Sequence, residues 1–258
     1  MKAADRTRSS ARVGAGPGDP ELLTMKALRA IRSASVLLVD DLVSAAVLDF
    51  ALCGLQPQPR IVHVGKRGGC ASTPQAFIER LMVGEAKRGE RVVRLKGGDP
   101  FIFGRGGEEA ERLRAQGIRV DIVNGITAGS AAAASLGVPL THREHAHGVM
   151  LVTGHGARDA DGFDIAAAAR TGLTLVIYMG VSSVERLQQR LLTALPADTP
   201  AAAIENVSLP QQRQIVTTLG RLGADMRRER IGSPAVLLVG KVLRALPGNP
   251  AVLTFLEA

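Results

Sequence analysis

The 258-residue chain contains 46% hydrophobic and 22% charged residues, a globular composition long enough for one large domain or two small ones. Its 32 Lys and Arg residues outnumber its 24 Asp and Glu residues, and the net charge of +8 fits either a solvated surface or a polyanionic partner. The chain has no Trp, one Tyr and 3% aromatic residues, which excludes the stacking surfaces of single-strand nucleic-acid binding proteins, so no nucleic-acid partner is expected.

The N-terminal residues and the two cysteines favour a cytoplasmic location. The first six residues are polar and lack the apolar stretch of a signal peptide. No apolar run approaches the roughly 18 residues that span a bilayer, so no membrane partner is expected. Cys53 and Cys70 have neither a metal-binding spacing nor the pattern of a disulfide framework.

A polar tail over residues 1–10 is predicted to be disordered, and strand-like runs then alternate with helical segments. The predicted strands are Val36–Val39, Ile61–Val64, Val92–Leu95, Val120–Val123, Val149–Thr153, Thr174–Met179, Ala201–Glu205, Gln214–Thr218 and Ala235–Val239. The predicted helices are Pro20–Ser33, Pro74–Arg88, Gly107–Gln116, Thr127–Leu136, Ser182–Ala194 and Arg221–Arg228. This alternation predicts an α/β protein with mostly parallel sheets flanked by helices.

The segment Gly137-Val138-Pro139-Leu140 is the best candidate for a linker. It would divide the chain into an N-terminal α/β domain over residues 11–137 and a C-terminal α/β domain over residues 138–258. Ligands commonly bind in clefts at domain junctions, so the active site is expected there.

A glycine-rich loop, Gly14-Ala15-Gly16-Pro17-Gly18-Asp19-Pro20, joins the first strand to the first helix. It is not a dinucleotide-binding loop, because the third glycine of that motif is replaced by Asp19, at the place where a pyrophosphate would lie. The loop is therefore either a tight turn between strand and helix or a place where another ligand approaches the backbone.

The segment 96–109 is more informative, because it follows the strong strand Val92–Leu95 and has five glycines between residues 97 and 107. Ligands of α/β proteins bind at the carboxyl ends of strands, and a plain connection would not need so many glycines. Asp99 could accept hydrogen bonds from a ribose or bind a cation, and Arg105 could bind a carboxylate.

Three other segments carry polar groups of interest. Lys66 and Arg67 end the strand before Gly68-Gly69 and could bind an anion, although the full phosphate-loop motif is absent. Asp40-Asp41 follows a strand and provides either a proton acceptor or a solvated turn. The histidines within 142–147 do not share one helix face, so surface or substrate contacts are expected and no metal site is.

These motifs together resemble the tetrapyrrole methylase family, and the resemblance runs from Val13 to about Val242. The matching segments are Val-Gly-Ala-Gly-Pro-Gly-Asp-Pro at 13–20, Asp-Leu-Val-Ser at 41–44, Val-Gly-Lys-Arg at 64–67, Arg-Leu-Lys-Gly-Gly-Asp-Pro-Phe-Ile-Phe-Gly-Arg-Gly-Gly-Glu-Glu at 94–109, Gly-Ile-Thr-Ala at 125–128, Pro-Leu-Thr-His-Arg at 139–143, Val-Thr-Gly-His at 152–155, Tyr-Met-Gly at 178–180 and Ser-Pro-Ala at 233–235. Within the family, the segment 94–109 is similar to the members that methylate uroporphyrinogen III.

The resemblance implies a homodimer of two-domain chains that use S-adenosylmethionine and release S-adenosylhomocysteine. Each domain is expected to contain a mixed, mostly parallel sheet flanked by helices. It implies methylation of uroporphyrinogen III at carbon on two adjacent pyrroles, by way of precorrin-1 to precorrin-2, for siroheme or cobalamin synthesis. The cofactor contacts that it implies are Pro17, Gly97, Gly98, Asp99, Ile102, Thr127, Ala128, Met179 and Val207. It implies Asp40 as proton acceptor and Lys66 as proton donor, with Arg105 as a further catalytic candidate. The substrate contacts expected on the same basis are Lys66, Arg67, Arg105, Glu108 and Arg143.

The sequence departs from the family pattern at three places. The first strand reads Ser9-Ser10-Ala11-Arg12-Val13 instead of a longer apolar run, so it is expected to be short or frayed. Asn124 stands where a proline is common. Val207 stands where relatives often have Gly or Ala, and it would crowd the cofactor while keeping the backbone contact.

Four alternatives remain open from the sequence. A related methylase could act on a later corrin intermediate, or a protein of the same fold could methylate ribosomal RNA, which the net charge would suit. A tetrapyrrole carrier or regulator would bind without forming product. A nicotinamide oxidoreductase is disfavoured by the incomplete glycine motif.

Overall fold

The computed structural model describes residues 9–65, 74–154 and 163–246. The chain forms two compact units, Met1–Thr127 and Ala128–Ala258. The predicted boundary at residue 137 lies ten residues further along the chain, because the helix Ala128–Ser135 packs against strands of the second unit. No helix among the described residues is long and apolar enough to cross a membrane.

The first unit is a five-stranded parallel sheet with the strand order β3-β2-β4-β1-β5. Its strands are β1 (Ser9–Gly14), β2 (Val36–Val39), β3 (Arg60–His63), β4 (Val92–Lys96) and β5 (Arg119–Val123). Its helices are α1 (Met25–Arg32), α2 (Ala45–Leu52), α3 (Gln75–Lys87) and α4 (Gly106–Arg114), with a short 3-10 turn over Pro20–Leu22.

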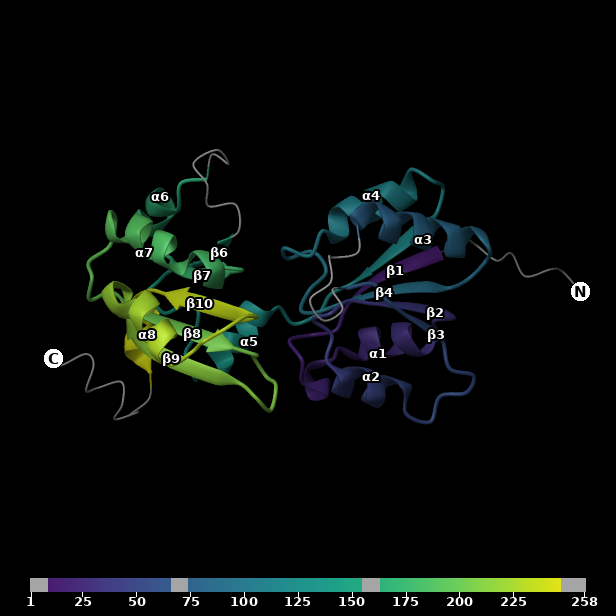
Figure 1. The fold of residues 1–258 in the computed structure, drawn as a ribbon, viewed down its shortest axis with the longest axis horizontal. Helices are drawn as coiled ribbons and strands as arrows, with labels where there is room; N and C mark the ends of the chain where they lie inside the picture. Colours follow the sequence, from purple (N-terminus) through teal and green to yellow (C-terminus); the bar gives the residue numbers. More distant parts are fainter. Residues whose placement is uncertain (1–8, 66–73, 155–162, 247–258) are drawn as a thin grey trace, which may run out of the picture. The chain divides into compact units, whose positions relative to one another are not determined.

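Helices cover both faces of this sheet, α1 and α2 on one and α3 and α4 on the other (Figure 1). Side chains of β1, β2 and β4 alternate between the two layers, so that Val93 and Leu95 face α1 and α2 while Val92 faces α3. The central strands are therefore buried on both faces, as expected of a parallel sheet.

The second unit contains a mixed sheet with the order β6-β7-β10-β8-β9. Its strands are β6 (Val149–Thr153), β7 (Thr174–Tyr178), β8 (Pro200–Glu205), β9 (Arg213–Thr218) and β10 (Ala235–Val239), and its helices are α5 (Ala128–Ser135), α6 (Ile165–Arg170), α7 (Val184–Leu192) and α8 (Leu222–Arg228). Of the described strands in this sheet only β6 and β7 are parallel, so five of the eight strand pairs that the structure describes are parallel.

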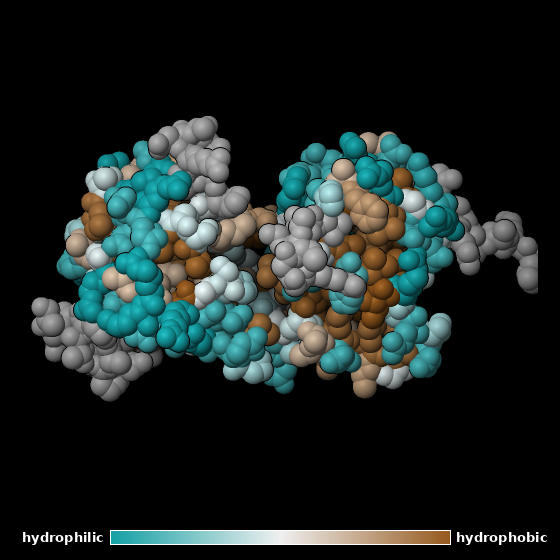
Figure 2. All heavy atoms as spheres, viewed as in Figure 1, coloured by the Kyte–Doolittle hydropathy of each residue, from teal (hydrophilic) through white to brown (hydrophobic). Residues whose placement is uncertain are grey.

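The core of the second unit lies between its sheet and helices α6, α7 and α8. Helix α7 buries Val184, Leu187 and Leu191, which are spaced as one face of a helix requires. Figure 2 shows mostly hydrophilic residues on the visible surface over α7 and α8. Helix α5 contributes nothing to this core and packs instead against β7 and β10, with Gly129 beside Val176 and Tyr178.

The elements differ from the predicted ones in a few places. The predicted helix Pro20–Ser33 is a 3-10 turn followed by α1, because the hydroxyl of Thr24 caps the new helix by accepting the Ala27 N–H at 3.1 Å. Strand β1 was expected to be short or frayed, which is wrong: it spans six residues in the interior of the sheet. Ser9 and Ser10 thus belong to a strand, while residues 1–8 of the expected tail lie outside the described residues.

Candidate active site

The five parallel strands of the first unit all end at one edge of the sheet, and the loops that follow them form the candidate site. β1 and β4 are neighbours, yet the helices that follow them, α1 and α4, pack on opposite faces. Such a reversal opens a crevice outside the carboxyl ends of the strands, which is where open α/β sheets bind ligands. The loops that begin at Ala15 and at Gly97 lie at this point.

The glycines of these loops allow three chain segments to meet. Gly16 and Gly98 exchange backbone hydrogen bonds, with N···O distances of 3.2 and 2.7 Å. A Cβ on Gly14 would lie 2.5 Å from the Gly125 nitrogen and 2.6 Å from the Gly98 carbonyl oxygen. The absence of a side chain at Gly14 therefore lets the backbones pack closely, which favours the interpretation of a tight turn at that position.

Asp99 holds the loops after β4 and β5 together. Its side chain is buried, and Oδ1 accepts a hydrogen bond from the Phe101 N–H at 2.8 Å. Oδ2 accepts bonds from the Asn124 side-chain amide and from the Gly125 N–H, both at 3.2 Å. Asn124 thus supplies a donor that the proline common at this position could not supply.

The loop after β2 lies against the same glycines. Ser44 donates its hydroxyl to the carbonyl of Gly18 at 2.6 Å and also caps α2. A Cβ on Gly97 would lie 2.7 Å from the Cβ of Leu42. The structure therefore brings the Asp40 loop, the first glycine loop and the segment after β4 to one edge of the sheet.

Beneath this edge lies a buried ionic cluster, made of Arg12 on β1, Arg94 and Lys96 on β4, and Glu109 on α4. The Arg12 Nε atom lies 3.1 Å from Glu109 Oε2, and Arg94 Nε and Lys96 Nζ each lie 3.7 Å from Glu109 Oε1. All four residues are buried, and Gln75 on α3 donates a further hydrogen bond to Glu109 at 3.1 Å.

Burial lowers the pKa of Arg12 to about 10, although Glu109 opposes the shift. Burial also lowers the pKa of Lys96, and the nearby Arg94 cation adds to that effect. These directions reflect the cost of placing cations in a poorly solvated region.

The sequence predictions missed this cluster. The available signal was the presence of Arg12, Arg94 and Lys96 at alternate positions of otherwise apolar strands, which places them on one face of the sheet. Glu109 was also passed over, since only its neighbour Glu108 was expected to contact substrate. Arg94 extends the cluster to the candidate site, because its Nη2 atom lies 2.6 Å from Asp40 Oδ1.

Arg105, the N-cap residue of α4, and Glu108, in the first turn of that helix, bind each other. The Arg105 Nη2 atom lies 2.6 Å from Glu108 Oε2, and both side chains are 57% exposed. The hydrogen bond from Arg105 lowers the pKa of Glu108, and the same bond raises the pKa of Arg105. Both charges are thus accessible to a ligand. Lys66 and Arg67 lie outside the described residues.

In the second unit, the candidate residues Met179 and Val207 follow β7 and β8. Both strands run antiparallel to β10, so they end at the same edge of the sheet. Met179 is 48% exposed, whereas the side chain of Val207 is buried. Thr127 and Ala128 are half-buried at the start of α5, where Gly129 donates its N–H to the Tyr178 hydroxyl at 2.9 Å.

Backbone strain collects in these loops. Among the described residues six non-glycine residues have positive φ, and five of them follow β4, β7 or β8. The five are Phe103, Arg105, Met179, Asn206 and Ser208. Such conformations cost about 1–3 kcal/mol each and are concentrated at ligand sites. Sequence patterns could not identify them, since none is a residue type reserved for that conformation.

The histidine segment forms a turn closed by pairing of His142 with Ala146. The His142 and His145 rings stack at 4.6 Å, and together with Glu144 they offer ligand atoms within 4.8 Å of one another. Arg143 in the same turn is exposed. The expectation that no metal binds here stays a prediction. It was based on the histidines not sharing one face of a helix, and that reason does not apply because the segment is a turn.

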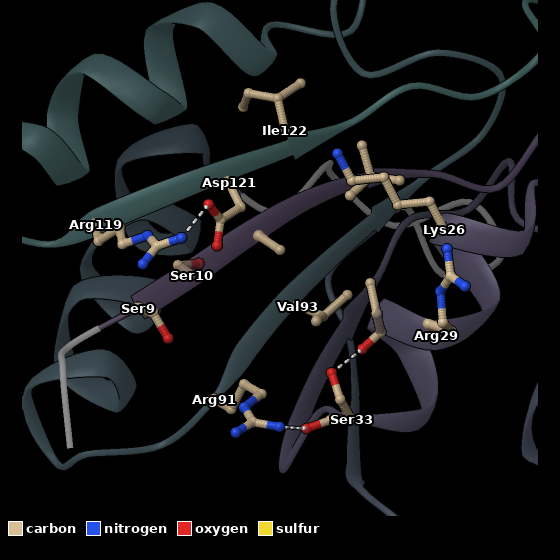
Figure 3. Close-up of a pocket in the computed structure, with 13 residues that line it drawn as sticks. Ser9, Ser10, Lys26, Arg29, Ser33, Arg91, Val93, Arg119, Asp121 and Ile122 are labelled. Atoms are coloured by element: carbon tan, nitrogen blue, oxygen red, sulfur yellow. Dashed lines mark hydrogen bonds and ion pairs between the residues drawn. The ribbon is translucent and has the colours of Figure 1, made fainter. Parts of the chain in front are cut away.

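A pocket of about 640 Å³ lies elsewhere in the first unit (Figure 3). Lys26 and Arg29 of α1, together with Arg91 and Arg119, surround a floor that includes Val93. Arg91 and Arg119 lie at the amino ends of β4 and β5, and the pocket opens on the α1 side of the sheet. It is therefore distinct from the candidate site at the carboxyl ends.

Comparisons with known proteins agree with this geometry. A family model for Tetrapyrrole (Corrin/Porphyrin) Methylases matches residues 11–223. The chain is 52% identical over 243 residues to uroporphyrinogen-III C-methyltransferase of Pseudomonas aeruginosa, covering 94% of this chain and 97% of that protein. The structure is similar to uroporphyrin-III C-methyltransferase of Thermus thermophilus complexed with S-adenyl homocysteine, with a TM-score of 0.76, 38% identity and coverage of 92% and 99%. It is also similar to a cobalt precorrin-4 methyltransferase, with a TM-score of 0.82, 25% identity and coverage of 94% and 98%.

Proposed function

The chain belongs to the tetrapyrrole (corrin/porphyrin) methylases, and from that membership we propose that it transfers methyl groups from S-adenosylmethionine to carbon atoms of uroporphyrinogen III. The observation that carries the proposal is the 52% identity over 94% of the chain to a uroporphyrinogen-III C-methyltransferase. The higher TM-score of the precorrin-4 enzyme does not favour a later corrin substrate, because one fold hosts several substrates and that identity is only 25%.

The residues proposed to hold S-adenosylmethionine suit such a ligand. Gly97 and Gly98 present half-buried backbone that a side chain would obstruct, and Ile102 and Met179 offer partly exposed apolar surface. Asp99 would act by fixing the loop, since its carboxylate already accepts three hydrogen bonds from the protein. The remaining proposed contacts are Pro17, Thr127, Ala128 and Val207. When bound, the sulfonium group supplies an activated methyl group.

The edge of the first sheet suits a macrocycle with an apolar ring and many carboxylates. Leu42, Phe101 and Phe103 are exposed there by 58%, 47% and 42%, so they offer apolar surface to a ligand. Arg105 and Glu108 are accessible beside them. We assign the substrate carboxylates to Lys66, Arg67, Arg105 and Arg143, with Glu108 as a further contact.

The main task of the protein is to hold the pyrrole carbon and the methyl group in line at about 3–3.5 Å, since both reactants are already reactive. A proton must leave the macrocycle after each transfer, and we assign its removal to the Asp40 carboxylate. Lys66 is proposed as proton donor and Arg105 as a further catalytic group. We also propose a cytoplasmic homodimer, which light scattering after gel filtration would test.

The test is an anaerobic incubation of the purified protein with uroporphyrinogen III and S-adenosylmethionine, followed by mass spectrometry of the tetrapyrrole. A gain of two methyl groups is expected, and none without S-adenosylmethionine. If S-adenosylhomocysteine binds but no methyl group is gained, the substrate proposal is wrong and a panel of corrin intermediates follows. Binding of tetrapyrrole without any product would indicate a carrier instead.

A further inference from the structure

The Asp40 carboxylate is held in place by strand β4. Its backbone N–H donates to the Leu95 carbonyl at 3.1 Å, and its Oδ1 atom lies 2.6 Å from Nη2 of Arg94. The Asp40 side chain is 26% exposed, whereas that of Arg94 is 2% exposed. Among the described residues nothing donates a hydrogen bond to Oδ2. Arg94 therefore binds one oxygen of Asp40, while the side chain as a whole stays partly exposed.

Arg94 is itself paired in charge with Glu109, although its Nε atom makes no hydrogen bond among the described residues. The two side chains are fully buried, with 3.7 Å between Arg94 Nε and Glu109 Oε1. Arg12 and Gln75 approach Glu109 from β1 and α3, so this carboxylate cannot turn away without losing several partners. A contact chain thus runs from the helix α4 through Arg94 to the edge of the sheet.

Stability alone does not explain this arrangement. Buried ion pairs can often be replaced by apolar residues of similar volume without loss of stability. Here three cations, Arg12, Arg94 and Lys96, meet two carboxylates, Glu109 and Asp40, so the group is not even balanced in charge. A cation retained at this cost beside a partly exposed carboxylate indicates a role in placing that carboxylate.

We propose that Arg94, paired with Glu109, is a positioning residue that orients the Asp40 carboxylate for proton removal. This inference rests on the proposed function, because it takes Asp40 to be the proton acceptor. A charge-assisted bond of 2.6 Å restricts the rotation of a short side chain. Such restriction matters because a misplacement of about 1 Å can cost on the order of 100-fold in rate.

The test compares Arg94→Met and Arg94→Lys with Arg12→Met in the methylation assay. Arg12 is the matched control, because it is also buried and lies opposite Arg94 on the neighbouring strand β1. It forms an ion pair with Glu109, and no ion pair joins it to Asp40 among the described residues. Arg94→Met should lower kcat by about 10- to 100-fold, with KM for S-adenosylmethionine changed less than about two-fold. Arg94→Lys should recover part of the loss, and Arg12→Met should lower kcat by less than about three-fold.

A double variant separates positioning from general damage. If Arg94 acts through Asp40, adding Arg94→Met to Asp40→Asn should lower kcat little beyond Asp40→Asn alone. Additive losses, or equal losses in Arg12→Met and Arg94→Met, would overturn the proposal.

An inactive wild-type protein would refute the proposed substrate but would not decide the role of Arg94. The carboxyl-carbon NMR signal of Asp40 in aspartate-labelled protein, assigned with Asp40→Asn, then decides it. The signal should move in Arg94→Met and stay in Arg12→Met, and an unmoved signal in the Arg94 variants would contradict positioning. Arg94→Lys serves for both measurements if Arg94→Met does not fold.

Discussion

Glu109 is the residue on which the first unit most depends for balancing buried charge. It is fully buried and lies within 3.7 Å of nitrogen atoms from Arg12, Arg94 and Lys96. Glu85 on the neighbouring helix α3 is also a buried glutamate, but its partners Arg60 and Arg88 are exposed by 55% and 71%. The two glutamates therefore offer a matched comparison of a buried pair with a half-solvated one.

We expect Glu109→Gln to lower the free energy of unfolding by about 3–5 kcal/mol, because it leaves buried cations without their partner. Glu85→Gln should cost about 1 kcal/mol, since Arg60 and Arg88 can turn to water. Denaturant unfolding of both variants measures the difference. Equal losses would show that the partners of Glu109 are solvated in the variant.

The identities of several candidate residues could be predicted because the ends of parallel strands share one edge. Asp40, Gly97 and Gly98 were expected at the ends of strands, and the structure places them there, while their roles, which the resemblance implied, stay predictions. Arg94, the partner of Asp40, lies 54 positions along the chain, and Asn124, a partner of Asp99, lies 25 positions along it. These contacts could not be predicted, because they depend on which strands are neighbours. Sequence patterns describe the spacing within an element and carry no strand order.

Helix α6 depends on one capping residue. Asp164 accepts the Ala166 N–H at 2.9 Å, and its hydrogen bonds, first of all from Ala167, lower its pKa from 3.8. A carboxyl group whose pKa is lower in the folded state adds stability above its unfolded pKa and loses it as pH falls through the folded value.

Asp164→Ala should therefore lower Tm at neutral pH, and its difference from wild type should shrink as the pH falls below 3.8. Asp164→Asn keeps an accepting oxygen without the charge and is the control. Thermal unfolding at several pH values measures the effect. A Tm difference that does not change with pH would show that the carboxylate charge is irrelevant to the cap.

At the end of β1, the backbone of Gly14 packs directly against the backbones of Gly98 and Gly125. Gly14→Ala would place a methyl group on the Gly98 and Gly125 backbones, and we expect a loss above about 3 kcal/mol. Gly84 in α3 has open space at its Cβ position, so Gly84→Ala should raise stability by about 0.5–1 kcal/mol. Chemical denaturation of both variants checks the prediction, and a mild effect of Gly14→Ala would contradict the close approach.

The strands were easier to predict than the helices. Val36–Val39, Val149–Thr153 and Ala235–Val239 have the expected bounds, because short apolar runs between polar segments mark them clearly. Helix α2 was missed because Ala45–Leu52 is apolar on most sides and shows little helical periodicity. Helix α6 was missed because Ile165–Arg170 is short and rich in alanine.

The whole chain is two units, each with its own hydrophobic core. All five strands of the first sheet lie within residues 9–123, and all five of the second within residues 149–239. A fragment that ends at Thr127 should therefore fold alone. Circular dichroism and cooperative denaturant unfolding of the fragment test this, and a fragment without cooperative unfolding would show that the first unit needs the second.

Two α/β units with mixed, mostly parallel sheets were predicted, but not that the antiparallel pairs all lie in the second sheet. Antiparallel pairing of β10 with β7 and β8 follows from connections that carry no sequence signal of direction. The residues of α5 were assigned to the first unit, whereas they belong to the second. The contacts of α5 are with β7 and β10, which lie far along the chain and carry no local sequence signal.

The central place of β10 has a consequence for synthesis on the ribosome. Among the described residues β10 is the last strand to be made, yet it lies between β7 and β8 and joins two pairs of strands. Until residue 239 has left the exit tunnel, β7 and β8 each present an unpaired edge. The first unit can be complete by then, so we expect the nascent second unit to be the segment that needs protection by chaperones.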